Sequence, residues 1–299
     1  KTDPRGFAEE CEHAYNEKVA RAAGLIAENL SKSPIVLLSG PSGSGKTTTA
    51  KKLSDALEAR GVAAHTISLD HYFNTLDPKT APRTPAGDID FESPYCLDLQ
   101  LLDEHFGRLA RGEEILVPHF SFSLQSRDTS RAAPLRLEKD ELAIFEGIHA
   151  LNGMVTGPHQ EAFRLYISAR SDIEDGGEVM FKGTWTRLVR RAVRDSFFRG
   201  TDAPLTFSMW GNVRRGEKLH ISPYKNSANY RFNSSMPYEL PALKKFAAEV
   251  LSRVPCDIDR HGELCDILPS LLRFEDFAAS LIPQDSILRE FIGGGKYKY

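Results

Sequence analysis

A glycine-rich turn at residues 40–48, with the sequence GPSGSGKTT, carries the clearest chemistry in this chain. It fits the pattern G-x-x-x-x-G-K-[ST] in full, between an apolar run and a helical pattern. Glycines let backbone N–H groups converge on an anion, and the positive end of the next helix faces the same point. The pattern predicts a phosphate-binding loop for ATP, made by eight residues: Gly40, Ser42, Gly43, Ser44, Gly45, Lys46, Thr47 and Thr48.

Two acidic residues close strand-like segments and are candidates for the reacting centre. Asp70 ends the segment HTISLD, and Glu146 follows the apolar run LAIF. Ligands of open α/β sheets bind at the carboxyl ends of the strands, so both acids are expected near the loop. We expect Lys46 to contact the outer phosphates, Thr47 and Glu146 to bind Mg²⁺, and Asp70 to accept a proton from an acceptor hydroxyl or to share the metal. The alternative is that either acid only caps a strand.

An arginine-rich segment, RLVRRAVRD, is the second candidate for phosphate chemistry. On a helix, four arginines fall on one face: Arg187, Arg190, Arg191 and Arg194. Only Asp195 lies among them, so little local charge pairing is expected, and this favours a lid at about 183–215 over a solvated basic face. The side chains expected to stabilise the moving phosphoryl group are those of Arg191, Arg194 and Arg199.

The acceptor site is expected in the loop and hairpin between the first strands. Asp90 and Glu92 carry carboxylates that suit two adjacent sugar hydroxyls, although loop acids are often simply solvated. Aromatic rings stack on a flat base, and an amide offers both a donor and an acceptor to a pyrimidine edge. Four residues are candidates for base contacts: Tyr72, Phe120, Phe122 and Gln125. The alternative is that they are ordinary core or surface residues.

Strand-like and helical patterns alternate along the chain. Short apolar runs predict strands at 35–38, 65–70, 142–145 and 164–169, and three- to four-residue periodicity predicts helices at 7–30, 47–60, 97–111, 185–198 and 240–252. This order predicts an α/β fold, a doubly wound parallel sheet of the P-loop NTPase type. Residues 114–137 are expected to form a small β-hairpin substrate region, and the last 30 residues to be mostly helical.

The same patterns predict three parts of the chain. Residues 1–31 are expected to form an amphipathic helix, residues 32–255 a P-loop domain that includes the lid, and residues 256–299 a helical C-terminal extension packed on that domain. The initial Lys1 is compatible with a cut that removed a longer N-terminal region.

Composition excludes some function classes. The 299 residues carry a formal net charge of −3, so no global basic field predicts a nucleic-acid partner. No apolar run is long enough to cross a bilayer, which predicts no membrane partner. The four cysteines have the spacing of neither a disulfide framework nor a zinc site, and they favour a reducing, cytoplasmic compartment.

Several stretches together resemble the uridine kinase and phosphoribulokinase family. They occur in family order over residues 33–200: GPSGSGKTT, SLDHYF, DFESPYCLD, VPHFSFSLQSR, FEGIHALN and TRLVRRAVRDSFFRG. Two later stretches, FNSSMPYELPAL and IPQDSILREFIGG, resemble a longer bacterial branch whose members often carry an N-terminal region related to threonyl-tRNA synthetase.

The resemblance implies phosphorylation of uridine or cytidine at the 5′-hydroxyl, with Mg-ATP as donor and self-association as in relatives. By position, Asp70 matches the catalytic aspartate and Glu146 the magnesium-binding acid of the family. Glu92 matches a ribose-binding aspartate, Arg191 a substrate-side arginine, and Arg194 and Arg199 phosphate-side arginines. Three positions depart from the family pattern: Phe120 replaces a tyrosine and Gln125 a histidine at the base, and Thr201 replaces a lid arginine.

Two other function classes remain open from the sequence. One is a kinase of another small hydroxylated metabolite, such as a sugar phosphate or a pantothenate-like acid, and the aromatic pair at 120 and 122 favours a flat base over it. The other is a nucleotide-binding regulatory module with weak ATPase activity, which would need no base at Asp70. No base-reading motif separates ATP from GTP as the donor.

Overall fold

A five-stranded parallel sheet forms the centre of the molecule in the computed structural model, which describes residues 3–121, 124–255, 257–258 and 261–298. The strand order is β11-β8-β1-β7-β2, and every neighbouring pair is parallel. The bounds are β1 Ile35–Ser39, β2 Ala63–Ser68, β7 Glu141–Glu146, β8 Phe163–Ser168 and β11 Tyr230–Asn233. The predicted α/β class with a parallel central sheet is confirmed, and the four predicted strands lie within a residue or two of their expected positions.

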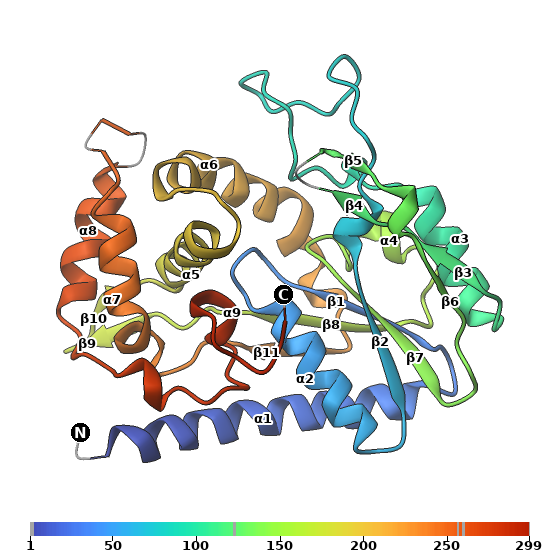
Figure 1. The fold of residues 1–299 in the computed structure, drawn as a ribbon, viewed down its shortest axis with the longest axis horizontal. Coiled ribbons are helices and arrows are strands. Elements are labelled where there is room, and N and C mark those ends of the chain that lie inside the picture. The colour runs from blue at the N-terminus through green and yellow to red at the C-terminus, as the bar shows by residue number, and fades with distance from the viewer. Residues whose placement is uncertain (1–2, 122–123, 256, 259–260, 299) are drawn as a thin grey trace.

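Helices cover both faces of this sheet (Figure 1). Side chains of β1 alternate between the faces, as a strand requires: Val36 and Leu38 pack with α1 and α2, whereas Ile35 and Leu37 pack with α3 and the segment around α4. All five residues of β1 are buried, which explains why this strand is a continuous apolar run rather than an alternating one. The helix bounds are α1 Pro4–Asn29, α2 Lys46–Glu58, α3 Leu99–Ala110 and α4 Gly153–Thr156.

A second core lies beside the sheet and is built mainly from helices (Figure 1). The largest fully buried side chain of the protein, Trp210, belongs to it, together with Leu188, Leu243 and Phe291. It consists of α5 Gly183–Phe198, α6 Ala203–Gly216, α7 Glu239–Leu251, α8 His261–Leu272, α9 Arg289–Ile292 and the hairpin β9 Ile173–Asp175 and β10 Glu178–Phe181. The arginine-rich segment is α5, and it therefore packs in the interior of this helical core.

The predicted hairpin region between residues 114 and 137 is present as two small antiparallel ladders. In one, β3 Ile115–Val117 pairs with β6 Ala133–Leu135, and in the other, β4 Phe120–Ser121 pairs with β5 Ser126–Arg127. Short 3-10 turns flank the long loop that precedes it, at Leu69–Tyr72 and Pro94–Cys96.

The expectation of a mostly helical C-terminus is wrong for the last 30 residues. Beyond α8, the described chain contains only the 3-10 turn Ala279–Leu281 and the single turn α9. Buried apolar residues such as Ile287 and Leu288 hold this segment against the main core in an irregular path, and three consecutive glycines from Gly293 follow α9. Sequence patterns also missed β11, a short edge strand with polar residues. Within the described part of the chain, no helix has the length and apolarity to span a membrane.

The packing of β1 gives a first prediction. Leu37→Ala removes a fully buried side chain and should lower the free energy of unfolding by about 3 kcal/mol. Leu116→Ala, at a site that is 58% exposed, should change it by less than about 0.5 kcal/mol. Urea denaturation measures both. Equal effects of the two substitutions would contradict the assignment of β1 to the core.

Candidate active site

The turn between β1 and α2 has the geometry of a phosphate-binding loop. Gly43 and Gly45 have φ values of +74° and +83°, which side chains rarely allow. A Cβ at Gly43 would also lie 2.7 Å from the carbonyl oxygen of Arg187. The first hydrogen bond of the regular helical pattern in α2 runs from Thr49 N to Gly45 O at 3.0 Å, so the amides that precede Thr49 lie at the open N-terminal end of the helix. These amides are the ones that a phosphate would use.

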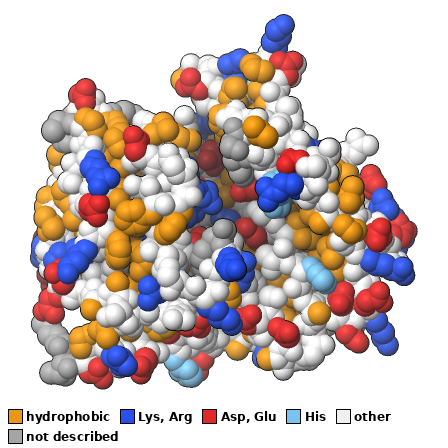
Figure 2. Space-filling model, in the orientation of Figure 1, with side chains coloured by type: hydrophobic (Ala, Val, Ile, Leu, Met, Phe, Trp, Pro, Cys, Tyr) orange, Lys and Arg blue, Asp and Glu red, His pale blue; other side chains and the backbone are white. Residues whose placement is uncertain are grey.

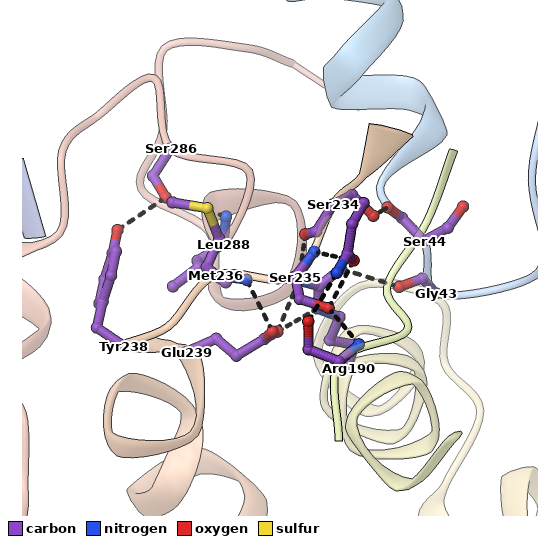
Figure 3. Close-up of polar contacts among 12 residues, drawn as sticks. Gly43, Ser44, Arg190, Ser234, Ser235, Met236, Tyr238, Glu239, Ser286 and Leu288 are labelled. Carbon is purple, nitrogen blue, oxygen red and sulfur yellow. Dashed lines mark hydrogen bonds and ion pairs between the residues drawn. The ribbon is translucent and has the colours of Figure 1, made fainter. Parts of the chain in front are cut away.

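Arg190 supports this loop from behind (Figure 3). Its guanidinium donates to Gly43 O at 3.2 Å, to Ser234 O at 3.0 Å and to the Glu239 carboxylate at 2.6 Å. The side chain is fully buried, so the ion pair with Glu239 offsets the cost of removing the arginine from water. Arg190 is therefore a structural support of the loop.

Two further side chains donate hydrogen bonds to carbonyl oxygens of the loop. Arg187 donates to Ser42 O at 3.3 Å and to Glu217 at 2.8 Å, and the Ser234 hydroxyl donates to Ser44 O at 2.7 Å. On the arginine face of α5, Arg187 and Arg190 thus have acidic partners that are remote in the sequence, beyond the local pairing that the sequence analysis considered. Arg187 is buried and paired with an acid 30 residues away, as Arg190 is with an acid 49 residues away, which the local sequence cannot reveal.

The three arginines predicted to act on the phosphoryl group share one carboxylate, and Arg191 also contacts the loop. Asp195 is within 3.2 Å of Arg191, 2.8 Å of Arg194 and 3.9 Å of Arg199. Arg191 also donates to the Ser42 hydroxyl at 3.0 Å. A single buried acid therefore holds three cationic groups together beside the phosphate-binding loop.

Glu146 and Asp70 meet at the carboxyl edge of the sheet. Glu146 ends β7 between β1 and β2, in register with Ser68, and it accepts a 3.2 Å hydrogen bond from the Thr47 hydroxyl. Asp70 follows β2 by two residues. Burial raises the pKa of Glu146 to about 7, Asp70 adds to this rise, and Lys46 and Thr47 oppose it. The two carboxylates are thus close enough to interact, as the strand order requires.

These oxygen groups fit a magnesium ion. Mg²⁺ prefers one or two carboxylates together with waters and substrate phosphates, and the Thr47 hydroxyl, Glu146 and Asp70 supply such donors beside the loop. When bound, the ion would neutralise charge on the outer phosphates. Burial lowers the pKa of Lys46, while Glu146, Glu290 and Asp70 counteract that shift, so its ammonium lies among these acids.

The long loop brings Glu92 to the same centre. Burial raises the pKa of Glu92 to about 7; Arg191 and Lys46 lower it, while Asp90 and Asp70 raise it further. Asp90 is buried, binds Arg215 at 2.7 Å and accepts the Glu92 amide at 3.2 Å. Glu92 therefore faces the reacting groups, whereas Asp90 positions the loop.

Of the residues expected to contact a base, Tyr72 and Phe120 pack against other ring side chains, and Gln125 is exposed. Tyr72 is fully buried in the core and its hydroxyl is 2.8 Å from His105 Nδ1, so the expectation that it stacks on a base is wrong. Phe120 is 8% exposed and packs against Phe73, with ring centroids 5.7 Å apart. Gln125 is exposed in the turn between β4 and β5, with φ of +50°, and Phe122 lies outside the described residues.

Two residues that the sequence analysis did not select also reach the site. Burial lowers the pKa of His149 to about 3, and this neutral ring lies beside His220, near Asp90 and Lys46. His149 comes three residues after Glu146 in the stretch FEGIHALN, so its position close to this acid could have marked it as a site residue. Glu290, on α9, accepts hydrogen bonds from Thr48, and no sequence pattern links residues so far apart.

The surface is hollowed between the helical part around α5 and α6 and the part that carries β4 and β5 (Figure 2). Basic and acidic side chains both lie within this hollow (Figure 2).

Comparison with known proteins places this arrangement among kinases. The family model described as Phosphoribulokinase / Uridine kinase family matches residues 35–237. A uridine kinase from Macrococcus caseolyticus is 28% identical over 201 residues, which are 67% of this chain and 87% of that protein. A uridine kinase from Schizosaccharomyces pombe is 30% identical over 165 residues, or 55% of this chain, and the match spans 32% of that protein's length.

Among solved structures, a D-glycerate 3-kinase from Cryptococcus neoformans is similar over 73% of this chain and 97% of its own, with a TM-score of 0.48 and 16% identity.

The raised pKa of Glu146 predicts a pH-dependent gain of stability in Glu146→Gln. Between its ordinary value of 4.5 and the folded value of about 7, the folded state retains a proton that the unfolded state has lost, so wild-type stability falls as pH rises. The neutral amide avoids this loss and should be more stable than wild type by roughly 3 kcal/mol at pH 8, and much less so at pH 5.

Urea denaturation at both pH values checks this result. The control is Glu141→Gln at the other end of β7, where a backbone hydrogen bond from Glu138 and the His65 side chain lower the pKa of the carboxyl. Its stability relative to wild type should not increase with pH. A Glu146→Gln variant that is less stable than wild type at pH 8 would contradict the burial argument.

Proposed function

The chain belongs to the Phosphoribulokinase / Uridine kinase family, and on that premise we propose that it transfers the γ-phosphoryl group of Mg-ATP to the 5′-hydroxyl of a pyrimidine nucleoside. The observation that carries the proposal is the position of Glu92, a loop carboxylate that interacts with Asp70, Lys46 and Arg191. A regulatory module that only binds nucleotide has no need of an acidic acceptor loop at its reacting centre.

The donor half of the reaction uses the loop and the arginines. The amides of the phosphate-binding loop and Lys46 bind the phosphates, and the arginines held by Asp195 lie where negative charge develops on the transferred group. Asp195 keeps these side chains oriented before the donor arrives, so less reorganisation is needed during transfer.

The acceptor half uses Asp70 and Glu92. Asp70 accepts the proton of the attacking hydroxyl, and Glu92 accepts hydrogen bonds from the sugar hydroxyls and so orients the acceptor. Asp70 and Glu92 both face the acceptor, and negative charge on these carboxyls repels an anion, which favours a neutral nucleoside over a phosphorylated sugar or an acid such as glycerate. The uridine kinases among the relatives support a pyrimidine nucleoside.

Asp70→Asn should abolish transfer while preserving nucleotide binding. The amide cannot accept the proton of the hydroxyl, so we expect kcat to fall by about 10²- to 10⁴-fold. The Kd for ADP should remain within about twofold, because loop amides rather than Asp70 bind the phosphates. Asp88→Asn, in an exposed part of the acceptor loop, is the matched control and should retain activity. Unchanged turnover in Asp70→Asn would exclude Asp70 as the base.

The acceptor class is tested by ADP release with Mg-ATP across nucleosides, D-glycerate, phosphorylated sugars and pantothenate. We expect stimulation by uridine and cytidine above the ATP-only background. With the active acceptor at pH 8, above the pKa of Glu92, Glu92→Gln should raise the KM for that acceptor by about tenfold, because a charged partner for the sugar hydroxyls is lost, and it should leave the KM for ATP unchanged. Stimulation by phosphorylated sugars alone would overturn the nucleoside proposal.

A further inference from the structure

Glu290 places a carboxylate against the first turn of α2. Its Oε2 atom accepts a hydrogen bond from the Thr48 amide at 3.2 Å and one from the Thr48 hydroxyl at 2.7 Å. Glu290 is 7% exposed and Thr48 is fully buried, so protein atoms fill this position. A buried anion thus occupies one of the places where the loop offers hydrogen-bond donors.

These donors belong to the phosphate-binding surface. Thr48 has the last amide before helical hydrogen bonding begins, because the next amide, of Thr49, bonds to Gly45 O. In loops of this pattern the lysine, here Lys46, binds the outer phosphates, and the hydroxyl of the next residue, Thr47, binds the metal. Thr48 lies one residue further into the helix, so its donors are directed to the innermost phosphate. The Glu290 carboxylate therefore lies where the innermost phosphate of a bound nucleotide would lie.

The backbone around Glu290 is firmly held, so only its side chain is free to yield. Ile287, Leu288 and Phe291 are fully buried, and Asp285 binds Lys52 at 2.7 Å. The neighbouring Ser286 hydroxyl also contacts Tyr238 (Figure 3). Displacement of the whole segment would expose these apolar residues at a high cost, whereas rotation of one side chain would not.

A second partner for the carboxylate is already adjacent. The other oxygen of Glu290, Oε1, is 3.9 Å from Arg194 Nη1. A rotation that breaks the contacts with Thr48 can therefore keep the charge of Glu290 compensated, which a buried carboxylate requires.

We propose that Glu290 is a donor-site residue whose carboxylate occupies the position of the innermost phosphate and moves from Thr48 to Arg194 when a nucleotide binds. The inference rests on the proposed use of a nucleotide donor and does not depend on the identity of the acceptor. It makes the C-terminal segment part of the donor site, and it means that part of the nucleotide's binding energy is used to displace an internal anion.

The test is the affinity for ADP, measured by calorimetry without Mg²⁺ in the full-length chain. Glu290→Gln retains an oxygen for Thr48 but lacks the charge, so it is displaced more easily. We expect its Kd for ADP to fall by about tenfold relative to wild type. The Kd for adenosine, which has no phosphate, should not change.

Asp285→Asn is the matched control, because it loosens the same segment through its contact with Lys52 and leaves the charge at Thr48 unchanged. Its Kd for ADP should stay within about twofold of wild type. Glu290→Asp, which retains the charge on a shorter side chain that reaches Thr48 less well, should also bind ADP more tightly; thermal unfolding verifies that each variant is folded.

Weaker or unchanged ADP binding by Glu290→Gln would overturn the proposal, since it would make Glu290 a permanent support of α2. Equal tightening in Asp285→Asn would overturn it as well, because loosening of the segment would then explain the effect. Neither result bears on the acceptor assay, so failure of the nucleoside proposal can be told apart from failure of this one.

Discussion

A phosphate-binding loop turns its amides inward, and this leaves carbonyl oxygens facing outward that need partners of their own. Here those partners come from outside the loop: Arg187 for Ser42 O, Arg190 for Gly43 O and the Ser234 hydroxyl for Ser44 O. Buried arginines in turn need buried acids, and Glu217 and Glu239 supply them. The helical core beside the sheet brings these arginines and acids together. The geometry of the loop therefore depends on α5 as much as on β1 and α2.

Charged side chains are concentrated at the carboxyl edge of the sheet. Carboxylates at Asp70, Glu92, Glu146 and Glu290 surround Lys46, and burial raises the pKa of two of them to about 7. A site of this kind is electrostatically costly without its ligands, because acids interact with one another where water is largely excluded. A bound triphosphate and its metal ion would redistribute these interactions, which links the stability of the protein to the binding of its donor.

The comparisons agree with the architecture and leave the acceptor to the chain's own residues. The family relationship is carried by residues 35–237, which include the sheet, the loop and α5. Outside that range lies the segment with Glu290, which nevertheless contacts Thr48 inside it. The donor site of this protein thus includes a part of the chain that the family model does not cover, and any account of its affinity for nucleotides has to include the C-terminus.

The sequence by itself determined four of the five strands, the loop and the two acids that follow strands, because each is encoded locally: apolar runs predict buried strands, glycines predict the turn, and strand ends of a parallel sheet meet at one edge. Only the tertiary structure decided which side chains face the ligand. Tyr72 lies in the core with His105, and Arg190 lies behind the loop with Glu239. Periodicity gives the face of a helix on which a residue lies but not what packs against that face, and contacts over tens to hundreds of residues are set by the folded arrangement alone.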